Sequence, residues 1–157
     1  MEIELRRRIY ATFANTAAGL GYSEVHGKII GCLLITPNPV SLATLAKETG
    51  YSASMISLSL DFLENLGMIE RVKHHGDRRL FVRTKGDLMQ AVKRAVQVKL
   101  ERSITDSRKE FEAYRREIKG LPDSEQKGLM LERVSVLEKE MKRFERYVRL
   151  VGKIRPP

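Results

Sequence analysis

The pattern of apolar and polar positions predicts two helices at the start of the chain, the second of them buried. Between Glu2 and Leu20 apolar residues recur at helical spacing, and the run from Val25 to Thr36 is apolar on nearly all sides. A helix that is apolar all round is normally buried. Pro37 and Pro39 end this second helix, because proline cannot continue its hydrogen bonding. We expect the second helix at the centre of the first folded unit.

The next stretch predicts two short helices joined by a tight turn. Ser41 can cap the first, which ends at Gly50, and Ser52 can cap the second, which runs to Leu66. A glycine tolerates the left-handed conformation that ends helices. The second helix turns four apolar side chains inward, at Ile56, Leu60, Leu63 and Leu66.

Two short strands are predicted after these helices, over Met68 to Lys73 and Leu80 to Thr84. The segment between them contains Gly76 and Asp77, and a Gly-Asp pair between β-prone runs indicates a hairpin. Helix, turn, helix and hairpin in this order are typical of a winged helix-turn-helix, which binds DNA.

The remainder of the chain predicts two long helices that form an antiparallel hairpin. One runs from Leu88 to Lys119, and the other begins at Asp123 or Ser124 after the break at residues 120–122. The second carries a heptad pattern of apolar residues at Met130, Val134, Leu137, Met141, Phe144, Val148 and Val151. Its methionines are expected to pack rather than to form a cofactor site. Such a hairpin buries little by itself, so pairing with a second subunit would complete it.

The expected fold is therefore mainly α with a small β-hairpin wing. Residues 1–86 would form the winged helix-turn-helix with its N-terminal helix, and residues 87–157 a helical dimerisation region. The residues expected to pair two subunits are the apolar positions of the first helix and of the two long helices: Leu5, Ile9, Phe13, Ile104, Phe111, Tyr114, Ile118, Leu137, Met141, Phe144 and Val148.

Composition and charge limit the partners and the cellular location that we expect for the protein. The formal net charge is +9, which suits a polyanionic partner, although most of the excess lies beyond Gly86 on the long helices. No apolar run approaches the roughly 20 residues that span a bilayer. The N-terminus lacks the apolar segment of a secretory signal. The single Cys32 lies in an apolar run, where a buried structural thiol is expected. A cytoplasmic protein without membrane contact follows.

The helix after Ser52 carries the expected base-contacting residues. Its early outward positions in a helix-turn-helix point into the major groove, and here they are Ser52, Ser54, Ser57 and Ser59. Serine hydroxyls do not make the bidentate pairs that discriminate bases strongly, so modest direct readout is expected. The alternative is that these serines are only small polar residues on an exposed face. Further contacts are expected from the preceding helix, at Ser41, Thr44 and Lys47.

Leu58 and Phe62 lie outside the inward stripe of this helix and are not explained by it. The alternatives are packing on the N-terminal helix and contact with thymine methyl groups.

The hairpin tip is the sharper electrostatic feature. Its candidate DNA contacts are Lys73, His74, His75, Arg78 and Arg79. Asp77 could orient a neighbouring arginine toward the minor groove or the backbone, and a solvated loop is the alternative. Together with His26 and Cys32, the two tip histidines lack recognisable metal-ligand spacing, so no metal is expected.

In these residues the chain resembles the MarR-type winged-helix regulators, most closely the GbsR-like branch. The resemblance is carried by LATLAKETGYSASMISLSLDFLENLGMIERV and GDRRLFV, and it covers roughly residues 10 to 90. It implies that the helix from Ser52 to Leu66 enters the major groove. It also implies that Arg78 and Arg79 contact the backbone or minor groove, and that the terminal helices form a homodimer. Some relatives sense small solutes, but no residues here identify a ligand.

The sequence thus predicts a homodimeric DNA-binding transcriptional regulator, with a repressor as the expected form. The alternative is a winged-helix protein-interaction or architectural module with only general affinity for nucleic acid. No enzyme and no cofactor are expected, because the chain has no phosphate-cradling glycine motif, metal-ligand cluster or nucleophile–base pair. The operator, the sign of regulation, the pathway and the existence of a small-molecule effector stay open.

Overall fold

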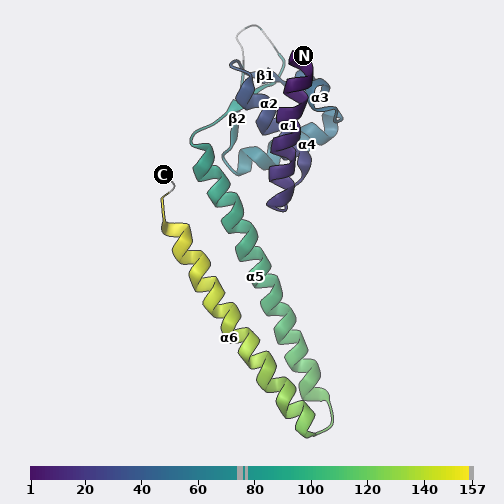
Figure 1. The fold of residues 1–157 in the computed structure, drawn as a ribbon, viewed down its shortest axis with the longest axis vertical. Coiled ribbons are helices and arrows are strands. Elements are labelled where there is room, and N and C mark those ends of the chain that lie inside the picture. The colour runs from purple at the N-terminus through teal and green to yellow at the C-terminus, as the bar shows by residue number, and fades with distance from the viewer. Residues whose placement is uncertain (74–75, 77, 156–157) are drawn as a thin grey trace. The chain divides into compact units, whose positions relative to one another are not determined.

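The computed structural model describes residues 1–73, 76 and 78–155 of the chain. It divides into two compact units, Met1–Val92 and Lys93–Pro157, so the division falls inside a helix, a little after the expected boundary at Gly86. The predicted architecture, mainly α with a small β wing and two long C-terminal helices, is confirmed (Figure 1). His74, His75 and Asp77 lie outside the described residues.

The first unit holds the helix-turn-helix and its wing. Its elements are α1 (Glu2–Gly19), α2 (Glu24–Ile35), β1 (Val40–Ser41), α3 (Leu42–Thr49), α4 (Ala53–Asn65), β2 (Ile69–Val72) and β3 (Phe81–Thr84). The long helix α5 (Leu88–Gly120) begins here and continues into the second unit.

Three of the predicted helix-turn-helix signals are confirmed. The Ser41 side chain accepts a hydrogen bond from the Thr44 amide at 3.1 Å, and that of Ser52 accepts one from the Met55 amide at 3.3 Å. Both satisfy amides that a helix start would otherwise leave unpaired. Gly50 ends α3 with φ at 77°, a conformation that other residues rarely adopt.

A third strand, which the sequence did not predict, completes the sheet. β3 lies between β1 and β2, and both pairings are antiparallel. Val40 faces Val82 and Ser41 faces Phe81, while Ile69 on the other edge faces Thr84. A strand of two residues is too short to show alternation, so only its pairing with β3 identifies it. The pairing holds the end of β3 nearest the wing tip beside the start of α3.

α2 is the centre of this unit, as its apolar composition predicted. Its Ile29 and Cys32 are fully buried, and α1, α3, α4 and β3 all contact the helix. The inward stripe of α4 is confirmed at Ile56, Leu60 and Leu63, whereas Leu66 is half-buried and ends the helix. The helix-turn-helix is thus held by one shared core.

α1 and α2 approach closely because two glycines of α2 face α1. A Cβ atom at Gly27 would lie 2.1 Å from the carbonyl oxygen of Phe13 and 2.7 Å from Cα of Ala14. One at Gly31 would lie 3.1 Å from the Phe13 ring. Phe13, expected to pair subunits, therefore packs at least partly within its own chain.

An aromatic cluster joins α2 to α4. The His26 ring stacks on Phe62 at a centroid distance of 4.5 Å, and Tyr22 lies 5.7 Å from Phe62. Phe62 therefore packs against α2 and the turn before it, which is neither of the two environments expected from the sequence. Within the described part of the chain, the buried Nδ1 of His26 has no hydrogen-bond partner, and burial lowers the pKa of this histidine.

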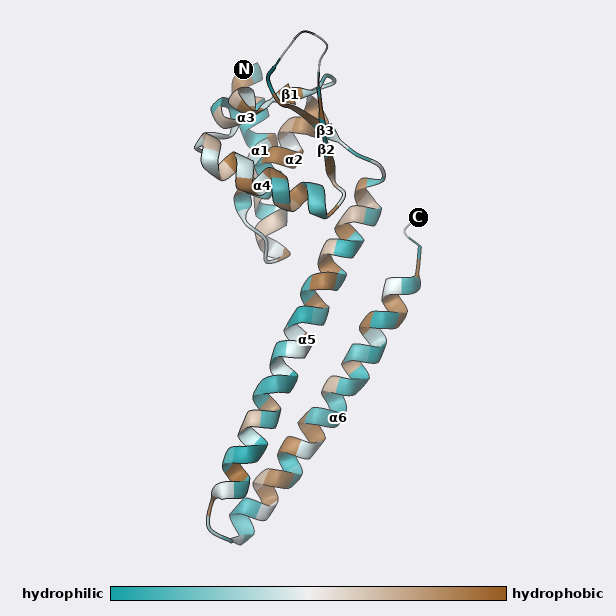
Figure 2. Cartoon of the chain, turned by 180° about the vertical axis from the view of Figure 1, so that it is seen from behind, coloured by the Kyte–Doolittle hydropathy of each residue, from teal (hydrophilic) through white to brown (hydrophobic). Residues whose placement is uncertain are grey.

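The second unit is a helical hairpin made of α5 from Lys93 onward and α6 (Glu125–Lys153). Ser124 caps α6, since its side chain accepts a hydrogen bond from the Lys127 amide at 3.1 Å. Hydrophobic bands recur along both helices among hydrophilic ones (Figure 2).

The hairpin buries three residues that were expected to pair subunits. Ile104, Ile118 and Val148 are buried in the single chain, the most exposed of them, Ile118, at only 7%. This corrects the expectation, because a long antiparallel neighbour already covers these positions. Phe111 and Met141 are half-buried, while Tyr114, Leu137 and Phe144 are exposed.

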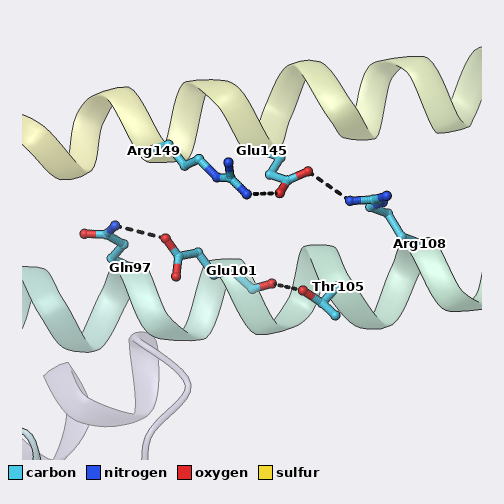
Figure 3. Close-up of polar contacts among 6 residues, drawn as sticks. All are labelled: Gln97, Glu101, Thr105, Arg108, Glu145 and Arg149. Atoms are coloured by element: carbon cyan, nitrogen blue, oxygen red, sulfur yellow. Dashed lines mark hydrogen bonds and ion pairs between the residues drawn. The ribbon is translucent and has the colours of Figure 1, made fainter.

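Ion pairs also join the two long helices. Arg115 holds Glu138 through two hydrogen bonds of 3.0 and 2.6 Å. Glu145 lies between Arg108, at 3.2 Å, and Arg149, at 2.6 Å (Figure 3). Charged pairs at an interface fix its register more than they stabilise it.

The close contact between α1 and α2 predicts that Gly27→Ala destabilises the protein. The added methyl group meets backbone atoms of α1 that cannot rotate away, so the two helices must separate. We expect a loss of roughly 2–4 kcal/mol in the free energy of unfolding, measured by urea denaturation. Gly19→Ala is the matched control, because nothing lies within 4 Å of a Cβ atom there. Equal stability of the two variants would contradict the close packing.

The burial of His26 predicts a loss of stability in mild acid. Its folded-state pKa is lowered, so the unfolded chain binds the proton more readily. Stability is therefore complete above the unfolded pKa of about 6.5 and falls as the pH drops below it toward the folded pKa. His26→Phe keeps a ring beside Phe62 and removes the titration. The unfolding free energy of the variant should change less between pH 7.5 and pH 5.5 than that of the parent. Because His74 and His75 are common to both proteins, an equal change in both would contradict the prediction.

Candidate nucleic-acid interface

The outer face of α4 presents an uncharged surface in its first two turns. Ser54 and Ser57 are exposed there, as expected, and Ser52 is exposed at the cap. Leu58, between these serines and the second half of the helix, is 72% exposed. The surface thus offers hydroxyl groups and one large apolar side chain.

Two of the candidate serines are buried, which corrects the sequence analysis. Ser59 is only 5% exposed, because a rotation of about 100° per residue places it with Ile56 and Leu63 on the inward face. Ser41 is 8% exposed, and its hydroxyl lies 2.9 Å from that of Thr44 in addition to capping α3. Neither is available to a base. Thr44 and Lys47 are exposed on α3.

The wing carries exposed basic side chains at the ends of both strands nearest its tip. Lys73 follows β2, and Arg78 and Arg79 precede β3. The guanidinium of Arg79 lies over the Phe81 ring, 5.4 Å from its centroid. This cation–π contact holds the arginine along the wing.

Two acidic residues of α4 are bound by one arginine of the wing, an arrangement that the sequence analysis missed. Arg71 of β2 forms ion pairs with both Asp61 and Glu64. Their carboxylates lie on the second half of α4, where they would repel DNA phosphates. Arg71 offsets part of that charge and links α4 to the sheet. In the sequence, the spacing of three residues indicates that Asp61 and Glu64 share one face of a helix. It does not indicate their partner, because Arg71 lies on another element.

A second cation positions the turn between α3 and α4. The ammonium of Lys28, on α2, lies 4.9 Å from the centroid of Tyr51, the residue before the cap Ser52. Such contacts contribute about 0.5–1 kcal/mol at exposed sites. The start of α4 is thus held against α2 by polar as well as apolar contacts.

A polar cluster at the C-terminal end of α3 links this helix to α1. The Tyr10 hydroxyl donates a hydrogen bond to Glu48 at 3.0 Å. Burial raises the pKa of Tyr10 and also that of the Cys32 thiol beside it, so both stay protonated at neutral pH. The hydrogen bond to Tyr10 raises the pKa of Arg6. These groups fix α3 in place, and Cys32 is the buried thiol that the sequence predicted.

The described residues include no group of three or more His, Cys, Asp or Glu side chains placed to hold a metal ion. None of the helices in the same part of the chain is both long and apolar enough to cross a bilayer.

Comparison with known proteins identifies the fold. No protein-family model matches the chain, and neither does any curated protein sequence. Among solved structures, one described as a transcriptional regulator matches with a TM-score of 0.61 and 19% identity, over 94% of this chain and 96% of that one. Two further matches score lower. A single-residue mutant of MepR from S. aureus, bound to an oligodeoxyribonucleotide, gives 0.44 at 17% identity, over 87% of this chain and 92% of that one. BldR from Sulfolobus solfataricus gives 0.43 at 20% identity, over 87% and 88%. The first match shows that this chain has the fold of a solved transcriptional regulator over nearly its whole length.

Proposed function

We propose that the protein is a homodimeric DNA-binding transcriptional regulator of the MarR type, closest to the GbsR-like branch, and that it acts in the cytoplasm as a repressor. The observation that carries the proposal is the exposed first half of α4. Its cap at Ser52, its uncharged outer face and its buried inner stripe suit a helix that enters the major groove. The full-length match in fold to a transcriptional regulator supports it.

The wing supplies the contacts that α4 lacks. α4 contains no Lys or Arg, so it contributes no phosphate-neutralising charge. Lys73 and Arg78 are exposed on the wing, and Arg79 lies beside them. Arginines there would bind the backbone or a narrow minor groove and would contribute most of the affinity. Thr44 and Lys47 on α3 would add contacts to the backbone.

Pairing of two subunits is proposed from a heptad seam that one chain uses only in part. Met130, Leu137, Phe144 and Val151 recur every seven residues on α6, and each is between 42% and 49% exposed. The alternating positions of the same seam, Val134 and Val148, are buried within the hairpin. Tyr114 of α5 and Leu5 of α1 are also exposed. A second copy would bury the exposed apolar row of α6, which water otherwise contacts.

A homodimer would present two α4 helices to successive major grooves, roughly 34 Å apart, so its operator should be a pseudo-palindrome. Bound there, the protein would block transcription by occupying the site, and this requires no catalytic group.

A second candidate function is a winged-helix protein-interaction or architectural module. The observation that favours it is the absence of basic residues from α4, together with the two acids Asp61 and Glu64. Such a protein would bind DNA only through its general positive charge, without preference for sequence.

DNA binding is tested by fluorescence anisotropy with DNA from upstream of the protein's own reading frame, against scrambled competitor, at two salt concentrations. We expect preferential binding that weakens steeply with salt, because phosphate contacts release counterions. Replacing both Arg78 and Arg79 by alanine should weaken binding by tenfold or more, because it removes phosphate contacts. It should also reduce the slope of log K against log salt concentration by about 0.9 for each contact that is lost. Lys142→Ala with Arg146→Ala is the matched control, because it removes the same charge from exposed positions on α6.

The same measurement is made with fragments of a random genomic library. If the protein binds all fragments weakly and equally, and both double variants lose this binding alike, the result would contradict the proposed regulator function and favour the interaction module. The library is included because the operator can lie away from the protein's own reading frame.

Pairing is tested by sedimentation equilibrium of the full chain. The parent should have twice the 18.0 kDa mass of one chain. Leu137→Glu with Phe144→Glu should give a monomer with unchanged helix content, because each buried carboxylate would lack a partner in the dimer. Lys142→Glu introduces the same acid on a different side of α6 and should leave the dimer intact. A monomeric parent, or a dimer that both sets of changes leave unaffected, would rule out this seam as the subunit interface.

A further inference from the structure

Leu58 is a large apolar residue on the exposed face of α4, where it does not pack against the rest of the protein. The other large aliphatic residues in the middle of α4, Ile56, Leu60 and Leu63, are buried, and Phe62 stacks on His26. Leu58 is 72% exposed, and by helical spacing it shares the outer face with Ser54 and Asp61. Its four carbons therefore contribute nothing to the core of the described chain.

The surroundings of Leu58 limit what this face can recognise. Ser54 and Ser57 are its neighbours one turn back and one residue back, and Met55 beside them is 46% exposed. The first half of α4 has no Arg, Lys, Asn or Gln, the side chains that bind guanine or adenine through two hydrogen bonds. The apolar group that the major groove does offer is the 5-methyl group of thymine.

Charge on the second half of α4 is compatible with this approach. Asp61 and Glu64 are bound by Arg71, so two of the helix's carboxylates are paired with a cation before any DNA arrives. The exposed basic residues of the wing, Lys73 and Arg78, then supply attraction to DNA phosphates. Basic charge on the wing and the uncharged outer face in the first half of α4 together favour DNA as the occupant of this face.

We propose that Leu58 determines sequence preference by packing against thymine methyl groups in the major groove, with Ser54 and Ser57 as its polar neighbours. This inference rests on the proposed DNA-binding function. It predicts an operator whose half-sites carry thymine at the positions that the middle of α4 reaches, and a specificity that depends on one methyl group rather than on a hydrogen-bonding pattern.

The test replaces single thymines of the operator half-site by deoxyuridine, which removes the methyl group and leaves base pairing unchanged. The operator is first obtained by selection from random duplex DNA, and affinities are measured by fluorescence anisotropy. With the parent protein, one or two positions should lose affinity by roughly fourfold each, the factor expected for one buried methyl group. Leu58→Ala should bind the thymine operator more weakly and should no longer distinguish uridine at those positions.

Ser57→Ala is the matched control, because it alters the same exposed face and keeps Leu58. Because Ser57 itself faces the DNA in this proposal, the control compares ratios and not absolute affinities: the variant should keep the fourfold difference between the thymine and uridine operators. Leu58→Ala removes no core contact, so its circular dichroism and unfolding midpoint should match those of the parent.

The two proposals fail in different ways. If selection yields an operator but uridine is tolerated everywhere, or if Leu58→Ala keeps the sensitivity of the parent, the role of Leu58 is overturned and the regulator stands. If selection yields no preferred sequence, the proposed function as a sequence-preferring regulator is overturned, and the proposed role of Leu58 is overturned as well.

Discussion

Burial of α2 is the constraint on which the first unit depends. This helix is apolar on almost every side, so it is stable only when other elements cover it, and α1, α3, α4 and β3 do so. Its glycines let α1 approach until the backbone of Phe13 would touch a Cβ atom at Gly27. The orientation of the helix-turn-helix follows, because α3 and α4 reach the core through the same helix. The outer face of α4 is therefore positioned by the core of the unit.

Polar contacts then fix what the apolar core leaves adjustable. The Tyr10 hydroxyl holds Glu48 at the end of α3, while Lys28 lies over Tyr51 at the start of α4. Arg71 reaches from the sheet to Asp61 and Glu64 on the far half of α4. Each of these contacts is weak alone, but each joins two different elements. Together they restrict how α4 can turn about its own axis, and that rotation decides which side chains face outward.

In the second unit, the apolar positions of α6 differ in their burial. α6 carries a heptad repeat in which Val134 and Val148 are buried in the hairpin, Met141 is half-buried and the other four positions are exposed. Ion pairs such as Arg115 with Glu138 accompany the apolar packing between the helices and help to set their register. A chain that needed the hairpin only for its own stability would gain nothing from Phe144 or Leu137 at the surface. The four exposed positions are those from which pairing with a second copy is proposed.

The sequence alone determined the local structure, because capping serines, helix-ending glycines and heptad spacing act over a few residues. Ser41, Ser52 and Ser124 cap helices as their positions predicted, and α6 begins where Ser124 allows it. Tertiary structure decided what depends on residues far apart in the chain. β1 exists only through its pairing with β3, and Phe62 is explained only by His26 across the core. Ser59 is buried because of the rotation of α4 about its axis, and Ile104 is buried because α6 packs against α5. Arg71 pairs with two carboxylates that lie on another element, α4. Periodicity predicts which residues share a face, whereas packing decides what covers it.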